Sequence, residues 1–172
     1  MSACIRAIIV FFFFSLTDCA LILPARRVSR REAAKREERQ FCGAEPMQIQ
    51  TEIISPQVIQ SVEPFYSIVS TGRTGEESRL QGARLLIRPL EGLGVERLES
   101  LLRCHAAREN LSQGNREAVM DDPYLLPDAL VDIQVESGRG NFVVYLRGHD
   151  VQEAHLIFAR ACRFTATRNP FN

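Results

Sequence analysis

The 172-residue chain has no tryptophan, only one lysine and no excess of charge of either sign. Its 21 basic and 21 acidic side chains cancel, so it lacks the basic field with which general nucleic-acid binders release counterions. Nucleic acid is therefore not an expected partner. The composition, 45% hydrophobic and 8% aromatic, excludes collagen-like, low-complexity and wholly disordered chains. The length predicts one compact domain with a tail.

The common catalytic and cofactor motifs are also missing. The sequence has no G-x-S-x-G, H-E-x-x-H, P-loop or dinucleotide fingerprint, and no C-x-x-C pair. Asp121, Asp122 and Asp128 share one connection, but carboxylates in a loop are more often solvated than bound to a cation. These absences predict a protein that is not an enzyme and has no cofactor.

No apolar run is long enough to span a bilayer without a charge. Residues 7–16 form a ten-residue apolar run after Arg6, which is the length of a signal-peptide core. A longer span would include Asp18 at a cost of about 2.5–3.5 kcal/mol. We therefore predict a signal peptide or lipoprotein signal over residues 1–25. Residues 16–19 resemble a lipobox, which would make Cys19 a lipidation site, and residues 23–25 are an alternative cleavage site. The predicted location is exported, periplasmic or envelope-anchored.

The positive charge after the apolar segment favours two interpretations that compete with export. Residues 26–39 hold seven basic and three acidic side chains, and positive charge after an apolar segment resists translocation. One alternative is an inner-membrane anchor with a cytoplasmic domain, and the other is a translation start at Met47. Beyond Met47 the chain has 13 Arg and 16 acidic residues, a net charge of −3. Membrane contact is expected only through an N-terminal lipid or anchor.

Hydrophobic periodicity predicts an α+β domain over residues 83–165. It follows a charged linker over 26–47, in which residues 30–40 form a solvated helix, and an irregular extension over 48–82 with a short strand at 65–69. A tail over 166–172 ends the chain. The domain's expected elements are a strand at 83–89, a helix at 95–109, strands at 131–136 and 142–147 joined by a Gly-rich turn, and a helix at 150–163.

This β-α-β-β-α order predicts a small ferredoxin-like unit. A right-handed crossover from the first strand to the second leaves room for the third strand between them. The expected product is a three-stranded antiparallel-type sheet with two helices on one face. Residues 164–167 are candidates for a fourth, edge strand.

Several short elements resemble a family of exported bacterial proteins of unknown function. They are Gly82-Ala83-Arg84, the turn from Pro89 to Leu93, and above all the run from Leu102 to Arg108, which contains a Cys-His-x-Ala-Arg helix motif. The resemblance covers about residues 55–163. The chain departs from the family at Gly94, where the family has a capping Thr, and near Asp122, where the family has a second Cys. The family implies no activity, and the departure implies that a metal or redox site built on both cysteines is incomplete.

Cysteine and histidine supply one candidate site. Without the signal segment the chain keeps Cys42, Cys104 and Cys162, which in an oxidising compartment predicts one disulfide in any of three pairings and one free thiol. At about 100° per residue, His105 lies in the apolar stripe of its helix. If the two helices run antiparallel, His105 and His155 approach each other, and with Cys104 or Cys162 nearby they suit a soft transition-metal ion. The alternatives are neutral, hydrogen-bonded histidines and a His-mediated pH switch.

The outer face of the sheet supplies a second candidate site. Its expected side chains combine apolar groups with opposed charges, as partner-binding sheets do. They are Arg84, Leu86, Arg88, Val143, Tyr145 and Arg147, beside Asp132, Gln134 and Glu136. The alternative is that residues 65–69 and their neighbours fold back and cover this face. We therefore expect an exported, envelope-associated, non-enzymatic interaction module whose partner is another envelope protein or a second copy. A metal-binding or redox-responsive periplasmic protein using Cys104 and His105 is the alternative.

Overall fold

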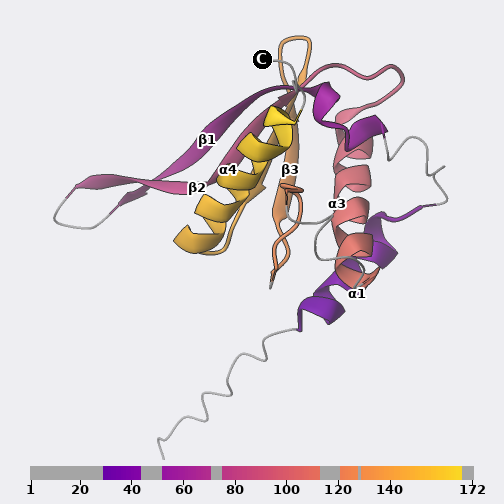
Figure 1. Cartoon of the computed structure of the whole chain (residues 1–172), viewed down its shortest axis with the longest axis horizontal. Coiled ribbons are helices and arrows are strands. Elements are labelled where there is room, and N and C mark those ends of the chain that lie inside the picture. Colours follow the sequence, from indigo (N-terminus) through magenta and orange to yellow (C-terminus); the bar gives the residue numbers. More distant parts are fainter. Residues whose placement is uncertain (1–28, 44–51, 71–74, 113–120, 128, 168–172) are drawn as a thin grey trace, which may run out of the picture.

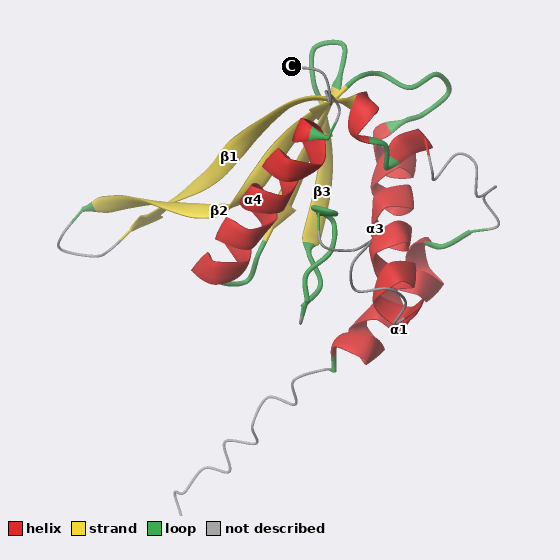
Figure 2. Cartoon of the chain, viewed as in Figure 1, coloured by secondary structure: helices red, strands yellow, loops and turns green. Residues whose placement is uncertain are grey.

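The computed structural model describes residues 29–43, 52–70, 75–112, 121–127 and 129–167. They form one four-stranded antiparallel sheet of order β1-β2-β4-β3, with the helices packed beside it (Figures 1 and 2). In chain order the elements are α1 (Arg30–Phe41), the 3-10 turn η1 (Pro56–Val58), β1 (Ile59–Ser70), β2 (Glu76–Ile87), α3 (Val95–Ser112), β3 (Asp132–Ser137), β4 (Phe142–Arg147) and α4 (Val151–Ala166).

The predicted α+β class is confirmed, and the expected three-stranded sheet is corrected to four strands. Strands β2, β3 and β4 are the three expected ones, with β4 between the other two. The fourth is β1, which contains the short strand predicted at residues 65–69 within the otherwise irregular extension, and which pairs along the free side of β2. Because β1 takes that edge, residues 164–166 are not an edge strand but the last turn of α4. A ferredoxin-like unit is thus matched only in part.

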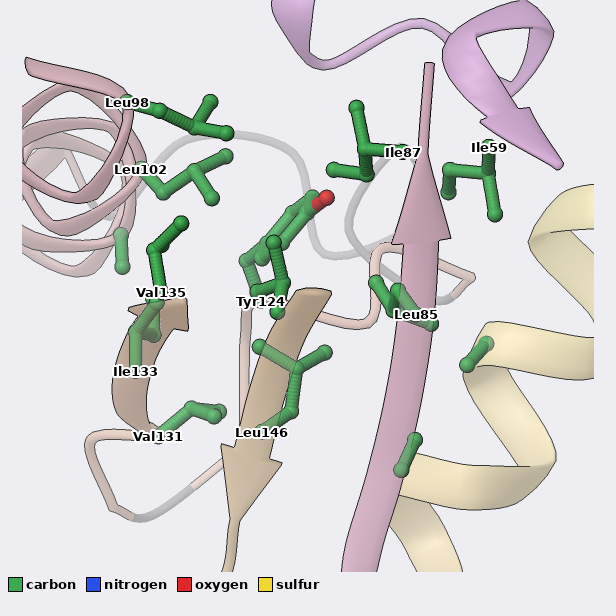
Figure 3. Packing of buried hydrophobic residues seen from close by; sticks show 14 of the residues in the cluster. Ile59, Leu85, Ile87, Leu98, Leu102, Tyr124, Val131, Ile133, Val135 and Leu146 are labelled. Atoms are coloured by element: carbon green, nitrogen blue, oxygen red, sulfur yellow. The ribbon is translucent and has the colours of Figure 1, made fainter. Parts of the chain in front are cut away.

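The core lies between the sheet and helices α3 and α4. Alternate strand residues such as Leu85, Val144 and Ile133 are buried on the helix-facing side. Helix α4 lies against β1, β2 and β4, and α3 lies against β3 (Figure 1). Between them Tyr124, from the connection after α3, is completely buried between the leucines of α3 and Ile87 of β2 (Figure 3).

Helix α1 packs against α3 instead of lying free in solvent. Ser29 and Glu32 form a capping box at its start, and Ala34 is fully buried. Arg30 donates to the side chain of Asn110 (2.6 Å) and to the carbonyl of Pro127. The segment expected to be a solvated helix within a linker is therefore part of the folded unit.

Strands β1 and β2 continue beyond the sheet as a two-stranded arm (Figure 1). Strand β2 pairs with β4 only between Gly82 and Ile87, and residues 76–80 pair with β1 alone. The register shifts at Phe65/Tyr66, which marks a β-bulge where the arm leaves the sheet. Gly82 occupies this bulge with φ of 151°, a conformation that favours glycine.

The N-terminal predictions concern residues that the structure does not describe. The signal segment over 1–25, Cys19 and Met47 all lie outside the described residues. Within the described ranges, no helix combines the length and apolar character needed to cross a bilayer.

Candidate interaction face and buried polar cluster

The residues predicted for the outer sheet face do share one face. Arg84 and Leu86 alternate with buried residues of β2, and Tyr145 and Arg147 alternate with buried residues of β4. Arg88, just after β2, is exposed. Residues 65–69 do not fold back over this face, because they belong to β1 and extend the sheet sideways. None of the described helices packs on it, since α3 and α4 both contribute to the core on the opposite side.

An aromatic–arginine cluster occupies the middle of this face. The rings of Phe65 and Tyr145 meet edge to face with centroids 5.0 Å apart, and the guanidinium of Arg147 lies 5.1 Å from the Phe65 ring centre. Phe65 of β1 and Arg147 of β4 are the two cross-strand neighbours of Gly82. A β-carbon at Gly82 would meet the backbone carbonyl of Leu146, so glycine is what allows β2 and β4 to approach each other here.

Polar contacts hold this cluster in position. Arg147 donates an Nη2 hydrogen to Gln134 Oε1 over 3.0 Å, and Gln134 donates in turn to Glu136. The Nε of Arg147 is buried and has no hydrogen-bond partner among the described residues. Arg84 pairs with Glu63 at 3.6 Å, but both side chains are about half exposed, so this pair adds little stability. The face thus presents a fixed apolar centre surrounded by charges of both signs.

The structure does not bring Cys104, His105 and His155 together. Cys104 is disulfide-bonded to Cys42, His105 contacts Asp122, and His155 is exposed on α4. In the described part of the chain no three potential metal-ligating side chains are grouped closely enough to hold an ion. Of the three possible cysteine pairings the chain adopts Cys42–Cys104, which leaves Cys162 free and exposed.

His105 forms a largely buried pair that the sequence did not suggest. Its Nε2 lies 2.7 Å from Oδ2 of Asp122, and the two side chains are only 13% and 12% exposed. The other oxygen of Asp122 accepts a hydrogen bond from the backbone N–H of Tyr124 over 2.8 Å. The pair therefore fastens the segment 121–127 to α3. No regular spacing relates a histidine in a helix to an aspartate 17 residues later in a loop, so only the fold reveals it.

Tyr124 and Arg160 complete this cluster beneath the surface. Burial raises the pKa of Tyr124, and the neighbouring Asp122 raises it further. Burial lowers the pKa of Arg160, with a further contribution from Arg163. Arg160 donates to the carbonyl of Leu125 over 2.6 Å, whereas the Tyr124 hydroxyl has no hydrogen-bond partner among the described residues. These contacts clamp the segment 121–127 between α3 and α4.

Arg103 and the first two residues of the Cys-His-x-Ala-Arg motif, Cys104 and His105, each make a contact that holds the fold together. Arg103, just before the motif, bonds the carbonyl of Ile133 and lies 4.8 Å from the ring centre of Phe41 in α1. Cys104 and His105 hold α1 and the segment 121–127 respectively. The run therefore organises three parts of the fold around α3.

Comparison with known proteins gives no information on the family or function of this chain. No protein-family model matches the chain, and neither a curated protein nor a solved structure does. The resemblance based on the Cys-His-x-Ala-Arg motif stays a prediction.

Proposed function

We propose that this chain is an exported, envelope-associated, non-enzymatic interaction module that binds a protein partner through the outer face of its sheet. The observation that carries the proposal is the cluster of Phe65, Tyr145 and Arg147, which is preassembled on a face that no described helix covers. Tyrosine and arginine are enriched among the residues that contribute most to binding energy at protein interfaces.

The chemistry of the face indicates a protein partner. Three arginines and three acidic residues surround the apolar centre, so the face carries no net charge for an anionic polymer or lipid surface to recognise. The arginines are Arg84, Arg88 and Arg147, and the acidic residues are Glu63, Asp132 and Glu136. A protein surface with an apolar centre and charges of both signs matches this arrangement. Because Tyr145 and Arg147 are already held by their neighbours, little side-chain entropy is lost on binding.

Export is supported by the Cys42–Cys104 bond. Disulfides persist in oxidising compartments and are rare in the cytosol. This agrees with the predicted signal segment over residues 1–25 and disfavours a cytoplasmic domain. Mass spectrometry of the protein from fractionated cells tests this part. A cleaved or lipidated N-terminus supports it, and an intact N-terminus in the cytosolic fraction contradicts it.

Photo-crosslinking in intact cells tests the binding face. A photoreactive residue at Arg84, exposed on the outer face, should crosslink one defined protein, whereas the same residue at Gln152, exposed on α4, should not. The identified protein is then purified and its affinity measured, with Tyr145→Ala expected to weaken binding at least about tenfold. Equal crosslinking at both positions, or unchanged affinity for Tyr145→Ala, contradicts the proposal.

The alternative is a redox-responsive or metal-binding periplasmic protein that uses Cys104 and His105. The Cys42–Cys104 bond favours the redox part, because its reduction would free α1 from α3. The metal part is less favoured, because the disulfide occupies Cys104 and Asp122 occupies one nitrogen of His105. Native mass spectrometry of the purified protein with and without His105→Ala tests it. Metal that is bound by the parent and lost in the variant would support this alternative.

A further inference from the structure

The two edges of the sheet differ in whether their backbone groups are already bonded. At the β3 edge, the N–H of Val135 donates to Glu99 Oε2 over 3.0 Å, and the carbonyl of Ile133 accepts from Arg103 over 2.9 and 3.1 Å. Glu99 and Arg103 also pair with each other on α3 at 3.2 Å. Side chains of α3 therefore occupy the positions that another strand would need. This edge is closed to strand addition.

The β1 edge has no such protection among the described residues. Strand β1 is 12 residues long and stands last in the sheet order, so its outer side pairs with no described strand. Every second residue of an edge strand directs its N–H and C=O outward, which makes it a template for another strand. This unpaired edge continues along the arm, where β1 extends beyond the main sheet (Figure 1).

The side chains of the arm also favour strand addition at the β1 edge over the β3 edge. Residues 65–70 read Phe-Tyr-Ser-Ile-Val-Ser, without a charge, glycine or proline. Within this segment Tyr66 is 53% exposed and Ile68 is 71% exposed. The charges of the arm, on Glu76, Glu77 and Arg79, all lie on the partner strand β2. An uncharged apolar edge of this kind associates with other strands unless something covers it.

The segment is complementary to itself in one antiparallel register. If Ser67 of two copies face each other across a two-fold axis, Tyr66 lies opposite Ile68 of the second copy on one face. Phe65 then lies opposite Val69 on the other face. Aromatic and β-branched side chains are favourable cross-strand neighbours, and no charges are opposed. Pro64 limits the ladder at one end, because proline has no N–H to donate.

We propose that a second copy of this chain binds along residues 65–70, so that two β1 strands pair antiparallel and join two sheets into one of eight strands. The interface is isologous, since the same segment serves both copies. The segment shares Phe65 with the outer face, but this proposal does not rest on the proposed function, because it uses the outward backbone groups of β1 and not Tyr145.

Disulfide trapping tests the register directly. In a protein carrying Cys162→Ser, Ser67→Cys should form an intermolecular disulfide under mild oxidation, because the two cysteines face each other directly. The matched control is Ser78→Cys, which lies opposite Ile68 on β2. Its two copies would be three strand spacings apart, roughly 14 Å, and should not link. Linking of both variants, or of neither, overturns the proposal.

Sedimentation velocity over a wide concentration range tests the assembly. The protein as purified from its cellular fraction should sediment as a dimer, and Ile68→Lys should shift it to a monomer with an unchanged far-UV circular dichroism spectrum. The control Ser78→Lys, with the same charge one strand further from the edge, should stay dimeric, as should Tyr145→Ala. A parent protein that is monomeric throughout, or a dimer that Ile68→Lys does not dissociate, overturns the proposal.

Discussion

Cys42, the residue that ends α1, is covalently bonded to Cys104 in the middle of α3. The bond joins residues 62 positions apart and fixes a helix whose main neighbour among the described elements is α3. Arg103, adjacent to Cys104, adds the contact with Phe41 and a 3.8 Å pair with Glu37. The N-terminal helix is thus attached by one covalent bond and a small set of polar contacts.

Removing this disulfide should destabilise the protein by about 4 kcal/mol, because a long loop closed in the unfolded chain is released. We expect Cys42→Ser/Cys104→Ser to unfold at a lower denaturant concentration than the parent, and reducing agent to have no further effect on it. Cys162→Ser is the control, since Cys162 is free and exposed. It should keep the parent's stability and its sensitivity to reductant. Equal stability of all three proteins would contradict the prediction.

The His105–Asp122 pair should show a measurable coupling energy. In a double-mutant cycle of His105→Ala and Asp122→Ala, we expect a coupling of about 1–2 kcal/mol, because both groups are largely buried and lie at hydrogen-bond distance. The control cycle uses Asp121 and Arg163, which are also 2.8 Å apart but about half exposed. That pair should couple by less than about 0.5 kcal/mol. Similar coupling energies in the two cycles would contradict the prediction, because burial would then not strengthen the His105–Asp122 pair.

Tyr124→Phe should leave the protein equally stable or stabilise it by up to about 1 kcal/mol at neutral pH. The buried hydroxyl has no hydrogen-bond partner among the described residues, so little is lost with it. The measurement is the denaturant midpoint of both proteins at pH 7. A loss of more than 1 kcal/mol would reveal a partner for the hydroxyl.

The same variant should change the response to alkaline pH. Burial raises the pKa of Tyr124, so the folded state keeps its proton while the unfolded state ionises near the ordinary tyrosine pKa of about 10. The stability of the parent should therefore fall, relative to Tyr124→Phe, by up to about 1.4 kcal/mol per pH unit above 10. Denaturant titrations of the parent and of Tyr124→Phe between neutral and alkaline pH measure this difference. Parallel pH profiles for parent and Tyr124→Phe would refute it.

Gly82→Ala should destabilise the fold by at least about 3 kcal/mol. A β-carbon at this position would clash with the carbonyl oxygen of Leu146 in β4, and φ of 151° is strained for alanine. Gly75→Ala is a control for the backbone effect alone, because φ there is 112° but a β-carbon would meet no neighbouring atom within 4 Å. We expect it to cost about 1–2 kcal/mol. Thermal melts of the two variants separate the clash from the strain.

The strands that the sequence predicts well are those with strict alternation. Residues 131–136 alternate apolar and polar side chains, the Gly-rich turn after them predicts the return strand at 142–147, and both strands bury alternate residues. The placement of β4 between β2 and β3 also followed, because the rules for crossover connections leave few other topologies. The outer face could be predicted for the same reason, since alternation fixes which side chains share a face.

The contacts of β1 and α1 could not be predicted in this way. Much of β1 lies in an arm where neither face is buried, so burial imposes no pattern on Tyr66 or Ile68. Helix α1 is highly charged, and it is attached to α3 by buried Ala34, the bond at Cys42 and a few polar contacts, which leave no apolar periodicity to read. Because α1 covers a second side of α3, Cys104 is buried on the side that faces α1.

By itself the sequence determined the α+β class, the helices, parts of all four strands and the composition of the outer face, because these follow from local patterns of neighbouring residues. Tertiary structure alone decided the place of the fourth strand in the sheet, the cysteine pairing and the contact of His105 with Asp122. Each of these joins residues across a long stretch of chain. Local patterns do not encode such pairings, which depend on how the whole chain packs around one core.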